Sequence, residues 1–314
     1  MAKIVVVGSL NMDVVAVASR LPIAGETLIG SQYLNEPGGK GANQAYAAGK
    51  LGGDVAMLGR VGTDDHGKRM RANLQAVGCD VENVKAVEGN SGVAVIFVAE
   101  SGQNSIVVVP GANHRYLRSD FQADVRSLTG AHFILLQLET PMETVVATSW
   151  AARRSGARVI LDPAPAPESL PSELLRNVDI LTPNEIEATQ LVGATVRNLS
   201  QDEAWDVARL LQKSGPKTVI IKLGAHGCLV ADGDVSTVVP APLVQAVDTT
   251  AAGDVFNAAL AVACSEGATL VEACRFAVHA AALSVTRFGA QRSVPSRAEL
   301  DSFIRRTNTQ VPDV

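Results

Sequence analysis

Two carboxylates enclose a run of small and hydroxyl-bearing residues late in the chain, Asp248-Thr249-Thr250-Ala251-Ala252-Gly253-Asp254. The mostly apolar residues from Val255 to Ala263 predict a helix that begins beside the second carboxylate. Small side chains let backbone N–H groups approach an anion closely, and a helix N-terminus favours negative charge. A carboxylate normally avoids a phosphate, so removal of a proton from an attacking hydroxyl would best explain Asp254. Taken alone, the segment fits an ordinary capped helix equally well.

A second segment, Gly38-Gly39-Lys40-Gly41-Ala42-Asn43-Gln44, is rich in glycine, basic and amide-bearing. Its glycines predict a tight loop that can approach a ligand, and a helix is expected over residues 42–51. Asn43 and Gln44 offer donors and acceptors that suit a polyhydroxylated ligand. The segment is not a P-loop, because its lysine precedes the last glycine and no GK[ST] follows. Alone, such a segment is more often a simple turn.

Together the two segments resemble the signature patterns of the PfkB carbohydrate kinases, and within that family the kinases that act on D-ribose. The first pattern continues to Gly52 and Gly62, and the second to Ala259-Leu260. Asp162 stands where many of these kinases carry an amide, a difference that we expect to leave the catalytic residues unaffected. The matches keep the family's order from residue 4 to about residue 303, and others are Gly8–Asp13, Gly25–Thr27, Pro110–Asn113, Thr182–Glu185 and Gly289–Gln291.

Length and composition indicate one folded enzyme domain spanning residues 1–314. Apolar content of 47% with only 4% aromatic residues predicts a core of Val, Leu, Ile and Ala. The net charge of −5 argues against nucleic acid as a partner. The four cysteines form no CxxC pair, too few residues precede the first apolar run for a secretion signal, and no apolar run approaches a membrane span of about 18 residues. We therefore expect a cytoplasmic protein without a membrane partner.

Short β-branched runs alternate with helical patterns through most of the chain. This order predicts an α/β fold: a doubly wound, mostly parallel sheet with helices on both faces, which the resemblance also implies. The predicted strands are Ile4–Val7, Val55–Leu58, Phe133–Leu136, Val159–Leu161, Val219–Lys222 and Cys228–Ala231. The predicted helices are Ala42–Leu51, Gly67–Val77, Glu143–Ser155, Asp202–Lys213 and Ala252–Ser265.

One region breaks the alternation, because Gly92–Ala99 and Ser105–Pro110 are strand-like runs with no helix between them. This pattern predicts a β-hairpin. Residues 14–34 are also extended in character. We interpret about 12–35 and 90–113 as a small β-sheet lid over the ligand edge of the main sheet. The resemblance implies that the lid covers the sugar and pairs with its copy in a homodimer.

Asn11 and Asp13 follow the first strand, at the edge where open α/β sheets bind ligands. Asp13 could accept hydrogen bonds from two sugar hydroxyls, and Asn11 could supply a donor and an acceptor; Asx capping of a turn is the alternative. The resemblance places both residues in the sugar site. It adds Gly39, Lys40, Gly41, Asn43, Glu139 and Asp254.

Phosphoryl transfer requires positioning, charge stabilisation and a base for the nucleophile. Asp254 is the candidate base, and the N–H groups of Ala251, Ala252 and Gly253 are candidates for an anion hole around the transferred group. Many members of the family carry glycine at position 251. Alanine can serve there if its backbone φ is negative.

Asn184 and Glu187 lie three residues apart at the start of a predicted helix, so they share a face and could order water around Mg²⁺ on the ATP phosphates. The resemblance implies that the turn from Lys222 through Gly224 to Gly227 follows the nucleotide. It also places His279 near the adenine, although core packing explains that histidine equally well. The resemblance further implies a potassium site, largely of backbone oxygens, at Asp248, Thr250, Ser284, Arg287, Gly289 and Ser293.

The resemblance therefore implies an ATP-dependent kinase for the 5-hydroxyl of D-ribose. The alternatives are a kinase for 2-deoxyribose, fructose or a nucleoside, and a non-catalytic sugar sensor on the same fold. A dinucleotide-binding oxidoreductase is disfavoured, because Gly8-Ser9-Leu10-Asn11 lacks the GxGxxG pattern and Asp13 would repel a pyrophosphate.

Overall fold

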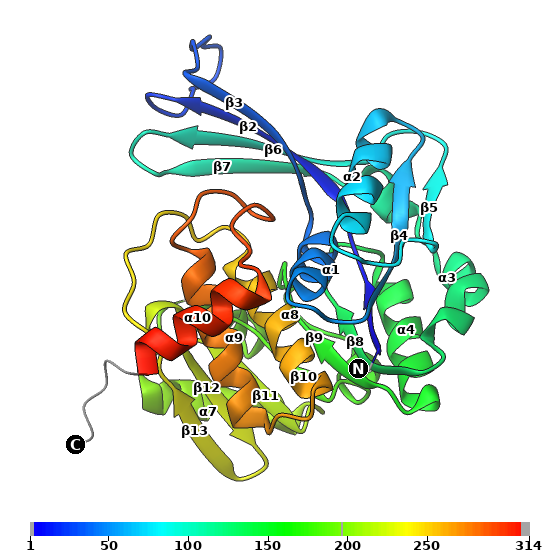
Figure 1. Ribbon diagram of the computed structural model, residues 1–314, viewed down its shortest axis with the longest axis vertical. Helices are drawn as coiled ribbons and strands as arrows, with labels where there is room; N and C mark the ends of the chain where they lie inside the picture. Colours follow the sequence, from blue (N-terminus) through cyan, green and yellow to red (C-terminus); the bar gives the residue numbers. More distant parts are fainter. Residues whose placement is uncertain (1–2, 196, 309–314) are drawn as a thin grey trace.

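A nine-stranded sheet runs through the centre of the molecule, in the order β13-β12-β11-β10-β9-β8-β1-β4-β5 (Figure 1). The computed structural model describes residues 3–195 and 197–308. Neighbouring strands from β11 to β5 are parallel, whereas β12 pairs antiparallel with β11 and β13, so the predicted mostly parallel sheet is confirmed. The strands are β1 (Lys3–Val7), β4 (Val55–Gly62), β5 (Val84–Val87), β8 (Ala131–Leu136), β9 (Arg158–Leu161), β10 (Ile180–Leu181), β11 (Thr218–Lys222), β12 (Cys228–Asp232) and β13 (Val235–Val239).

Helices cover both faces of this sheet, because alternate strand residues point to opposite sides and both sides are apolar. Ile4 and Val6 of β1 pack into one core, and Val5 and Val7 pack into the other. The first core lies under α1 (Lys40–Lys50), α2 (Asp65–Gln75), α8 (Ala252–Ser265), α9 (Leu270–Ser284) and α10 (Arg297–Asn308). The second lies under α3 (Arg118–Asp124), α4 (Met142–Ser155), α5 (Ser172–Leu175), α6 (Glu185–Leu191) and α7 (Gln201–Lys213).

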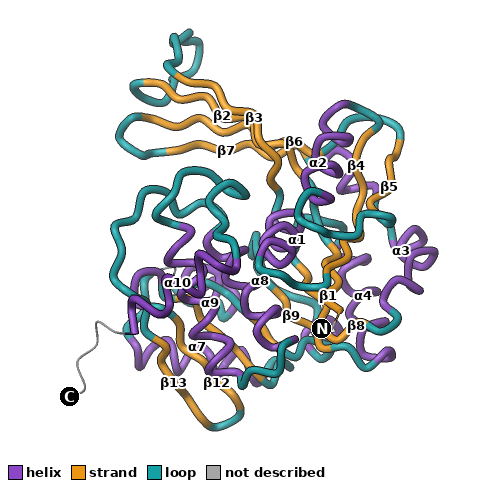
Figure 2. The backbone as a smooth tube through the Cα atoms, viewed as in Figure 1, coloured by secondary structure: helices purple, strands orange, loops and turns teal. Residues whose placement is uncertain are grey.

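A separate small sheet, in the order β3-β2-β6-β7, projects from the body of the molecule (Figure 2). We call it the small sheet; its strands are β2 (Asn11–Ala18), β3 (Gln32–Gly38), β6 (Gly92–Ala99) and β7 (Asn104–Val109). β6 and β7 form the predicted hairpin, and β2 pairs parallel with β6 and antiparallel with β3. The prediction of extended structure over residues 14–34 holds only at its ends, because residues 19–31 connect the strands without joining the sheet.

Several short elements escaped the sequence prediction. The sequence did not indicate β5, β10, β13, α3, α5 or α10, which are brief or lack a clear period. Three 3₁₀ turns complete the described chain: η1 (Gly111–Arg115), η2 (Val125–Leu128) and η3 (Gly224–His226). No helix within residues 3–195 and 197–308 is long and apolar enough to cross a membrane.

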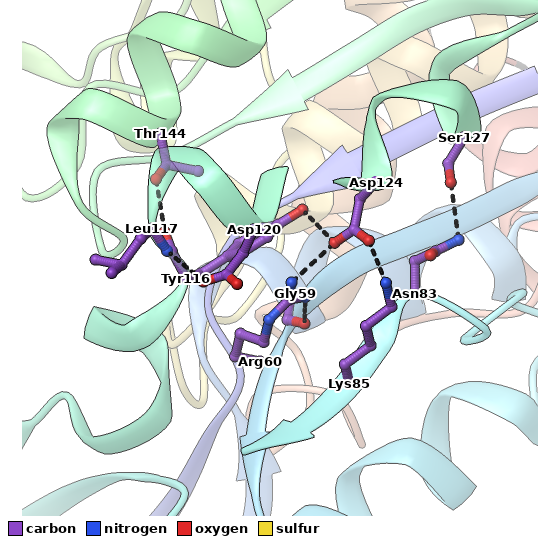
Figure 3. A network of polar contacts seen from close by, with 10 residues as sticks. All are labelled: Gly59, Arg60, Asn83, Lys85, Tyr116, Leu117, Asp120, Asp124, Ser127 and Thr144. Carbon is purple, nitrogen blue, oxygen red and sulfur yellow. Dashed lines mark hydrogen bonds and ion pairs between the residues drawn. The ribbon is translucent and has the colours of Figure 1, made fainter. Parts of the chain in front are cut away.

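A buried carboxylate, Asp124 at the end of α3, ties the outer strands to the helices beside them (Figure 3). Arg60 Nη2 on β4 lies 3.0 Å from Asp124 Oδ2, and its guanidinium stacks 4.2 Å from the ring centre of Tyr116. The Tyr116 hydroxyl donates to the same Oδ2 at 3.2 Å, and Lys85 on β5 pairs with Oδ1. Because the Arg60 and Asp124 side chains are at most 4% exposed, each needs the other as its counter-charge.

Asp124→Asn should lower the free energy of unfolding by about 3 kcal/mol, because it leaves the buried Arg60 guanidinium without an anion. Lys85→Met should cost less than about 1 kcal/mol, because the Lys85 side chain is 47% exposed and is compensated by water. Urea denaturation of both variants measures the difference. Equal losses of unfolding free energy in the two variants would show that burial does not determine how much the Arg60–Asp124 pair stabilises the protein.

Candidate active site

The predicted site residues collect at the carboxyl ends of the central strands. β1 leads into Asn11 and Asp13, β8 leads into Glu139, β9 leads into Asp162, and β11 ends at Lys222. The N-termini of α1 and α8 meet at the same edge, where side chains of α1 bond to the first turn of α8. Polar side chains and helix N-termini therefore converge where doubly wound sheets bind their ligands.

Asp254 lies on the first turn of α8 and is only 4% exposed. Nδ2 of Asn43 donates to its Oδ2 at 3.0 Å, and Nε2 of Gln44 donates to its Oδ1 at 3.0 Å. Burial raises the pKa of Asp254 to about 6; the Lys40 ammonium opposes this rise and the Asp162 carboxylate adds to it. A carboxyl group with this pKa, held in a fixed orientation, can accept a proton near neutral pH.

Ala251 is the N-cap residue of α8 and has a left-handed backbone, with φ 60° and ψ 10°. No other non-glycine residue in the described part of the chain has a positive φ. The condition of a negative φ is therefore not met, and Ala251 adopts a conformation that glycine would reach without steric cost. The requirement for small side chains is still met. A Cβ on Gly253 would lie 3.2 Å from Lys222 Nζ, so this ammonium borders the predicted anion hole.

Asp13 faces the other carboxylates from the base of the small sheet. A Cβ at Gly38 would come within 2.1 Å of Asp13 Oδ2, so only glycine fits beside it. Burial raises the pKa of Asp13 to about 7, and the charges of Glu139, Asp254 and Glu36 add to the rise. Asp13 is thus within electrostatic range of the candidate base, as a shared sugar site requires.

Asn11 is 3% exposed, and its Oδ1 accepts a hydrogen bond from Asn113 Nδ2 at 2.8 Å. Asn113 also bonds both backbone groups of Leu10, which fixes the turn after β1. Gly39 approaches this turn so closely, at φ 86°, that a Cβ would lie 2.6 Å from the Asn11 nitrogen. Gly41 meets the same turn, with a Cβ position 2.6 Å from the Ser9 nitrogen. The two glycines therefore let the start of α1 pack against the turn.

Lys40 and Glu139 join α1 to the end of β8. The Lys40 N–H donates to Glu139 Oε2 at 3.0 Å, and the Ser9 hydroxyl donates to the same oxygen. Burial of the Lys40 ammonium opposes its charge, but the carboxylates of Asp254, Asp162 and Glu139 outweigh burial and raise its pKa. Lys40 is therefore charged and lies among several acids of the site.

A cavity of about 440 Å³ opens on the other side of the anion hole. Four residues predicted to bind the nucleotide line it, namely Asn184, Lys222, Gly224 and Gly227, together with Gly253. Its remaining wall is mostly apolar and includes Pro242, Leu243, Val244, Phe256, Val278, Ala281, Ala282 and Val285. A polar end beside a helix N-terminus and an apolar end suit phosphates and a flat base, respectively.

Asn184 and Glu187 satisfy each other in a capping box at the start of α6. Glu187 N donates to Asn184 Oδ1 and Asn184 N donates to Glu187 Oε2, both at 2.8 Å. This leaves Oε1 of Glu187 outside the capping box. Burial raises the pKa of Glu187, and the Lys222 charge opposes the rise. Within the described residues, no group of three or more His, Cys, Asp or Glu could hold a metal ion directly.

His279 does not line the cavity of about 440 Å³, although the resemblance placed it near the adenine. Its Nδ1 lies 2.8 Å from the carbonyl oxygen of Arg275 on the same helix, and its ring meets Phe303 of α10 edge-on at 6.0 Å. Val278 and Ala282 of α9 face the cavity instead. A turn of about 100° per residue carries position 279 away from the cavity and into the contact with α10.

Asp248 organises the loop predicted to hold potassium. Its Oδ1 accepts bonds from the N–H (2.9 Å) and hydroxyl (2.7 Å) of Thr250, and its Oδ2 accepts from the Gly289 N–H at 2.8 Å. The Arg287 side chain turns away to Glu299 on α10. Ser284 accepts a bond from the Arg287 N–H at 3.0 Å through its carbonyl, and the Ser293 hydroxyl donates to Ala290 O at 2.8 Å.

The sequence did not identify two residues of this centre as site residues, Gln44 and Asp162. Gln44 bonds both carboxylates, Asp254 and Asp162, although it was noted only as a polar residue of the glycine-rich segment. Asp162 pairs with Lys222 and influences the pKa of Asp254. The acid at this position leaves every predicted catalytic residue in place, but it adds a negative charge that raises the pKa of Asp254. The position of Asp162 directly after a buried apolar strand was the available signal.

A buried acid at a helix start, between a cluster of polar side chains and a cavity of about 440 Å³, defines a small-molecule kinase on a doubly wound sheet. The pfkB family carbohydrate kinase model matches residues 1–297. The ribokinase of Haemophilus influenzae is 40% identical over 300 residues, which cover 95% of this chain and 97% of the relative. This chain belongs to the pfkB family of carbohydrate kinases.

Two further relatives bear on the substrate. The structure of Arabidopsis thaliana ribokinase complexed with ribose and ATP has a TM-score of 0.91 at 36% identity, and covers 97% of this chain and 99% of that one. The deoxyribokinase of Salmonella typhi is 36% identical over 302 residues, which cover 96% of this chain and 98% of the relative. A relative named for ribose and one named for deoxyribose, sugars that differ by one hydroxyl, are therefore equally similar to this chain in sequence.

Ala251→Gly should raise the free energy of unfolding by about 0.5–1 kcal/mol, because relief of the left-handed backbone exceeds the added entropy of the unfolded chain. Ala252→Gly is the matched control: position 252 begins α8 without a positive φ, so glycine should destabilise by about 0.5–1 kcal/mol there. Thermal and urea unfolding of both variants measure the two effects. Destabilisation of the same size at both positions would contradict strain at residue 251.

Proposed function

We propose that this chain transfers the γ-phosphoryl group of ATP to the 5-hydroxyl of D-ribose. The position of Asp254 carries the proposal: this buried acid lies within electrostatic range of Asp13 and directly follows the small residues 251–253. The similarity to ribokinases over at least 95% of the chain supports ribose as the acceptor.

In the proposed reaction, Asp254 accepts the proton of the 5-hydroxyl while that oxygen attacks the γ-phosphorus and ADP leaves. Asp13 and Asn11 bind other hydroxyls of the sugar and thereby hold the 5-oxygen in line. The N–H groups of Ala251, Ala252 and Gly253, with the Lys222 ammonium beside them, stabilise the negative charge of the transferred group. Lys40 keeps the neighbouring carboxylates from repelling the phosphates.

Two cations fit the residues present. Mg²⁺ would neutralise the phosphates and polarise the transferred group when bound, and Asn184 and Glu187 would hold it through water, since the capping box leaves one Glu187 oxygen outside it. Potassium would be held by the loop of Asp248, Thr250, Ser284, Arg287, Gly289 and Ser293, next to the anion hole. ADP release should require Mg²⁺ and rise when KCl replaces a tetramethylammonium salt; independence of both would refute these assignments.

We propose that residues 1–314 act as one kinase domain whose small sheet is a lid over the sugar, built from about 12–35 and 90–113. Glu36 on β3 pairs with Arg292 in the loop after α9, so the small sheet already contacts the body next to the site. Closure would exclude water, which competes with the sugar as phosphoryl acceptor. Small-angle scattering should show compaction when ribose is added; an unchanged curve would contradict a lid.

The small sheet also supports a proposed homodimer. Every residue of β7 is exposed, including Ile106, Val107, Val108 and Val109, so apolar side chains face solvent on both sides of this edge strand. A second copy of the sheet would cover them. Sedimentation should give about twice the chain mass of 32.7 kDa, and a single-chain mass at micromolar concentration would exclude the dimer.

We place the reaction in the cytoplasm, where ATP is available and thiols stay reduced. Cys79, Cys228, Cys264 and Cys274 are all free and buried, which is compatible with that compartment. Cell fractionation tests the assignment directly, and recovery of the protein outside the cytoplasm would overturn it.

A coupled ADP-release assay with D-ribose, 2-deoxyribose, fructose and a nucleoside tests the proposed substrate. Ribose should give the highest kcat/KM, with 2-deoxyribose second because it lacks one hydroxyl contact. A preference for another sugar would retain the kinase and replace the substrate. Ribose binding without ADP release from any sugar would instead favour the sensor.

Asp254→Asn should lower kcat by roughly 10²–10⁴-fold, the usual contribution of a general base. The amide keeps the shape of the side chain, so ribose binding measured by calorimetry should survive. Near-normal kcat in this variant would refute the assignment of the base.

The rate should fall on the acid side of neutrality. A raised carboxyl pKa means that the group gains its proton as pH falls through that value, and protonated Asp254 cannot act as a base. With pKa values raised to about 6 for Asp254 and about 7 for Asp13, log kcat/KM for ribose should approach a slope of two below pH 6. Asp13→Asn should leave a slope of one, and unchanged wild-type kcat/KM down to pH 5 would contradict both assignments.

A further inference from the structure

Asp162 divides its two carboxylate oxygens between the two halves of the candidate site. It follows β9, is 2% exposed, and accepts a bond from Lys222 Nζ to Oδ1 at 3.1 Å. Its Oδ2 accepts a bond from Gln44 Nε2 at 3.2 Å. An amide, which many members of the family carry at this position, would place an NH₂ donor where one of these oxygens stands and would carry no charge to pair with Lys222.

Lys222, the partner of the first Asp162 oxygen, lies on the side of the site where the phosphates would bind. The lysine ends β11, lines the nucleotide cavity, and has a side chain only 13% exposed. Its Nζ would lie 3.2 Å from a Cβ at Gly253, so the ammonium stands between Asp162 and the anion hole. A lysine side chain has four rotatable bonds, and the bond to Asp162 selects the conformation that keeps its charge at the hole.

Gln44, the partner of the second Asp162 oxygen, also bonds to Asp254, the candidate base. One amide nitrogen donates one hydrogen to Asp162 and the other to Asp254, at 3.2 and 3.0 Å. Two carboxylates can only accept, so they fix the amide with its nitrogen toward them, and Gln44 Oε1 accepts a bond from Gln137 Nε2 at 2.6 Å. The orientation of Asp254 is therefore linked to Asp162 through one side chain.

We propose that Asp162 is a positioning residue for phosphoryl transfer, which holds the Lys222 ammonium at the anion hole with one oxygen and orients Asp254 through Gln44 with the other. This inference rests on the proposed kinase reaction. Lys222 and Asp162 then act together: the lysine neutralises the buried carboxylate, and the carboxylate positions the lysine. Phosphate oxygens arriving at the hole would share the ammonium that Asp162 has already placed there.

Asp162→Asn should raise KM for ATP and lower kcat, each by roughly 10-fold or more, since a charge-assisted bond is lost and one partner is released. KM for ribose should change little.

The pH profile of kcat is a second measurement, which a purely structural role of Asp162 would leave unchanged. The charged groups facing Asp254 are Lys40 of α1, Asp162 after β9 and Asp13 of β2. Because the Asp162 charge raises the pKa of Asp254, its removal should shift the acid limb of kcat to lower pH.

Gln44→Met should shift the acid limb in the opposite direction. It also tests the proposal if Asp162→Asn fails to fold. The Gln44 hydrogen bond lowers the pKa of Asp254, so its loss should move the acid limb to higher pH while KM for ATP stays within about twofold. Lys222→Met should raise KM for ATP and move the limb to lower pH, as Asp162→Asn does, because the buried Asp162 then loses its counter-charge and takes up a proton. The double variant Asp162→Asn with Lys222→Met should be no worse in KM for ATP than either single variant.

Asp124→Asn is the matched control, because it also removes a buried, ion-paired carboxylate but lies in the network of Figure 3, which shares no residue with the candidate site. It should lower the melting temperature and leave both KM for ATP and the acid limb unchanged. Wild-type protein that releases no ADP with any sugar would refute the kinase reaction itself. An active wild type in which Asp162→Asn changes neither KM for ATP nor the limb, or in which Asp162→Asn and Lys222→Met effects simply add, would overturn the role of Asp162.

Discussion

The burial of one carboxylate constrains the rest of the site. Asp254 has lost its water, so fixed donors must replace it, and Asn43 and Gln44 do so from the start of α1. Those amides need partners of their own: Gln291 donates to Asn43 Oδ1 at 3.0 Å, and Gln137 donates to Gln44 Oε1 at 2.6 Å. α1, α8, the end of β8 and the loop after α9 must therefore keep their places for the Asp254 carboxylate to keep its orientation.

The charge balance of the site is unusual for one that binds a polyanion. Apart from Glu36, which pairs with Arg292, five carboxylates influence one another or the lysines between them, and two ammonium groups offset them: Asp13, Glu139, Asp162, Glu187 and Asp254 against Lys40 and Lys222. A nucleotide adds further negative charge, so positive charge must be placed at a short distance from the phosphates rather than spread through the pocket. The position of Lys222, bonded to an acid and bordering Gly253, meets that requirement.

Sequence reasoning succeeded where a pattern spans many residues. Buried apolar strands and helical periods predicted the sheet, both helix layers and the hairpin, and the small-residue turn before α8 predicted the start of that helix. It failed where one residue decides. The φ of Ala251 depends on tertiary contacts, not on the residue type. The period of α9 could not tell that position 279 faces α10, and only the fold shows Gln44 reaching both Asp254 and Asp162.

The two departures from the family's usual residues illustrate different physics. Ala251 keeps a costly backbone because its neighbours fix it: its carbonyl accepts from the Val255 N–H at 2.9 Å, as the first bond of α8. Asp162 introduces a buried charge, which could not persist without the lysine 60 positions away in the chain. The acid at position 162 is therefore stable only together with Lys222. The pair links the proposed phosphate side of the site to the proposed base.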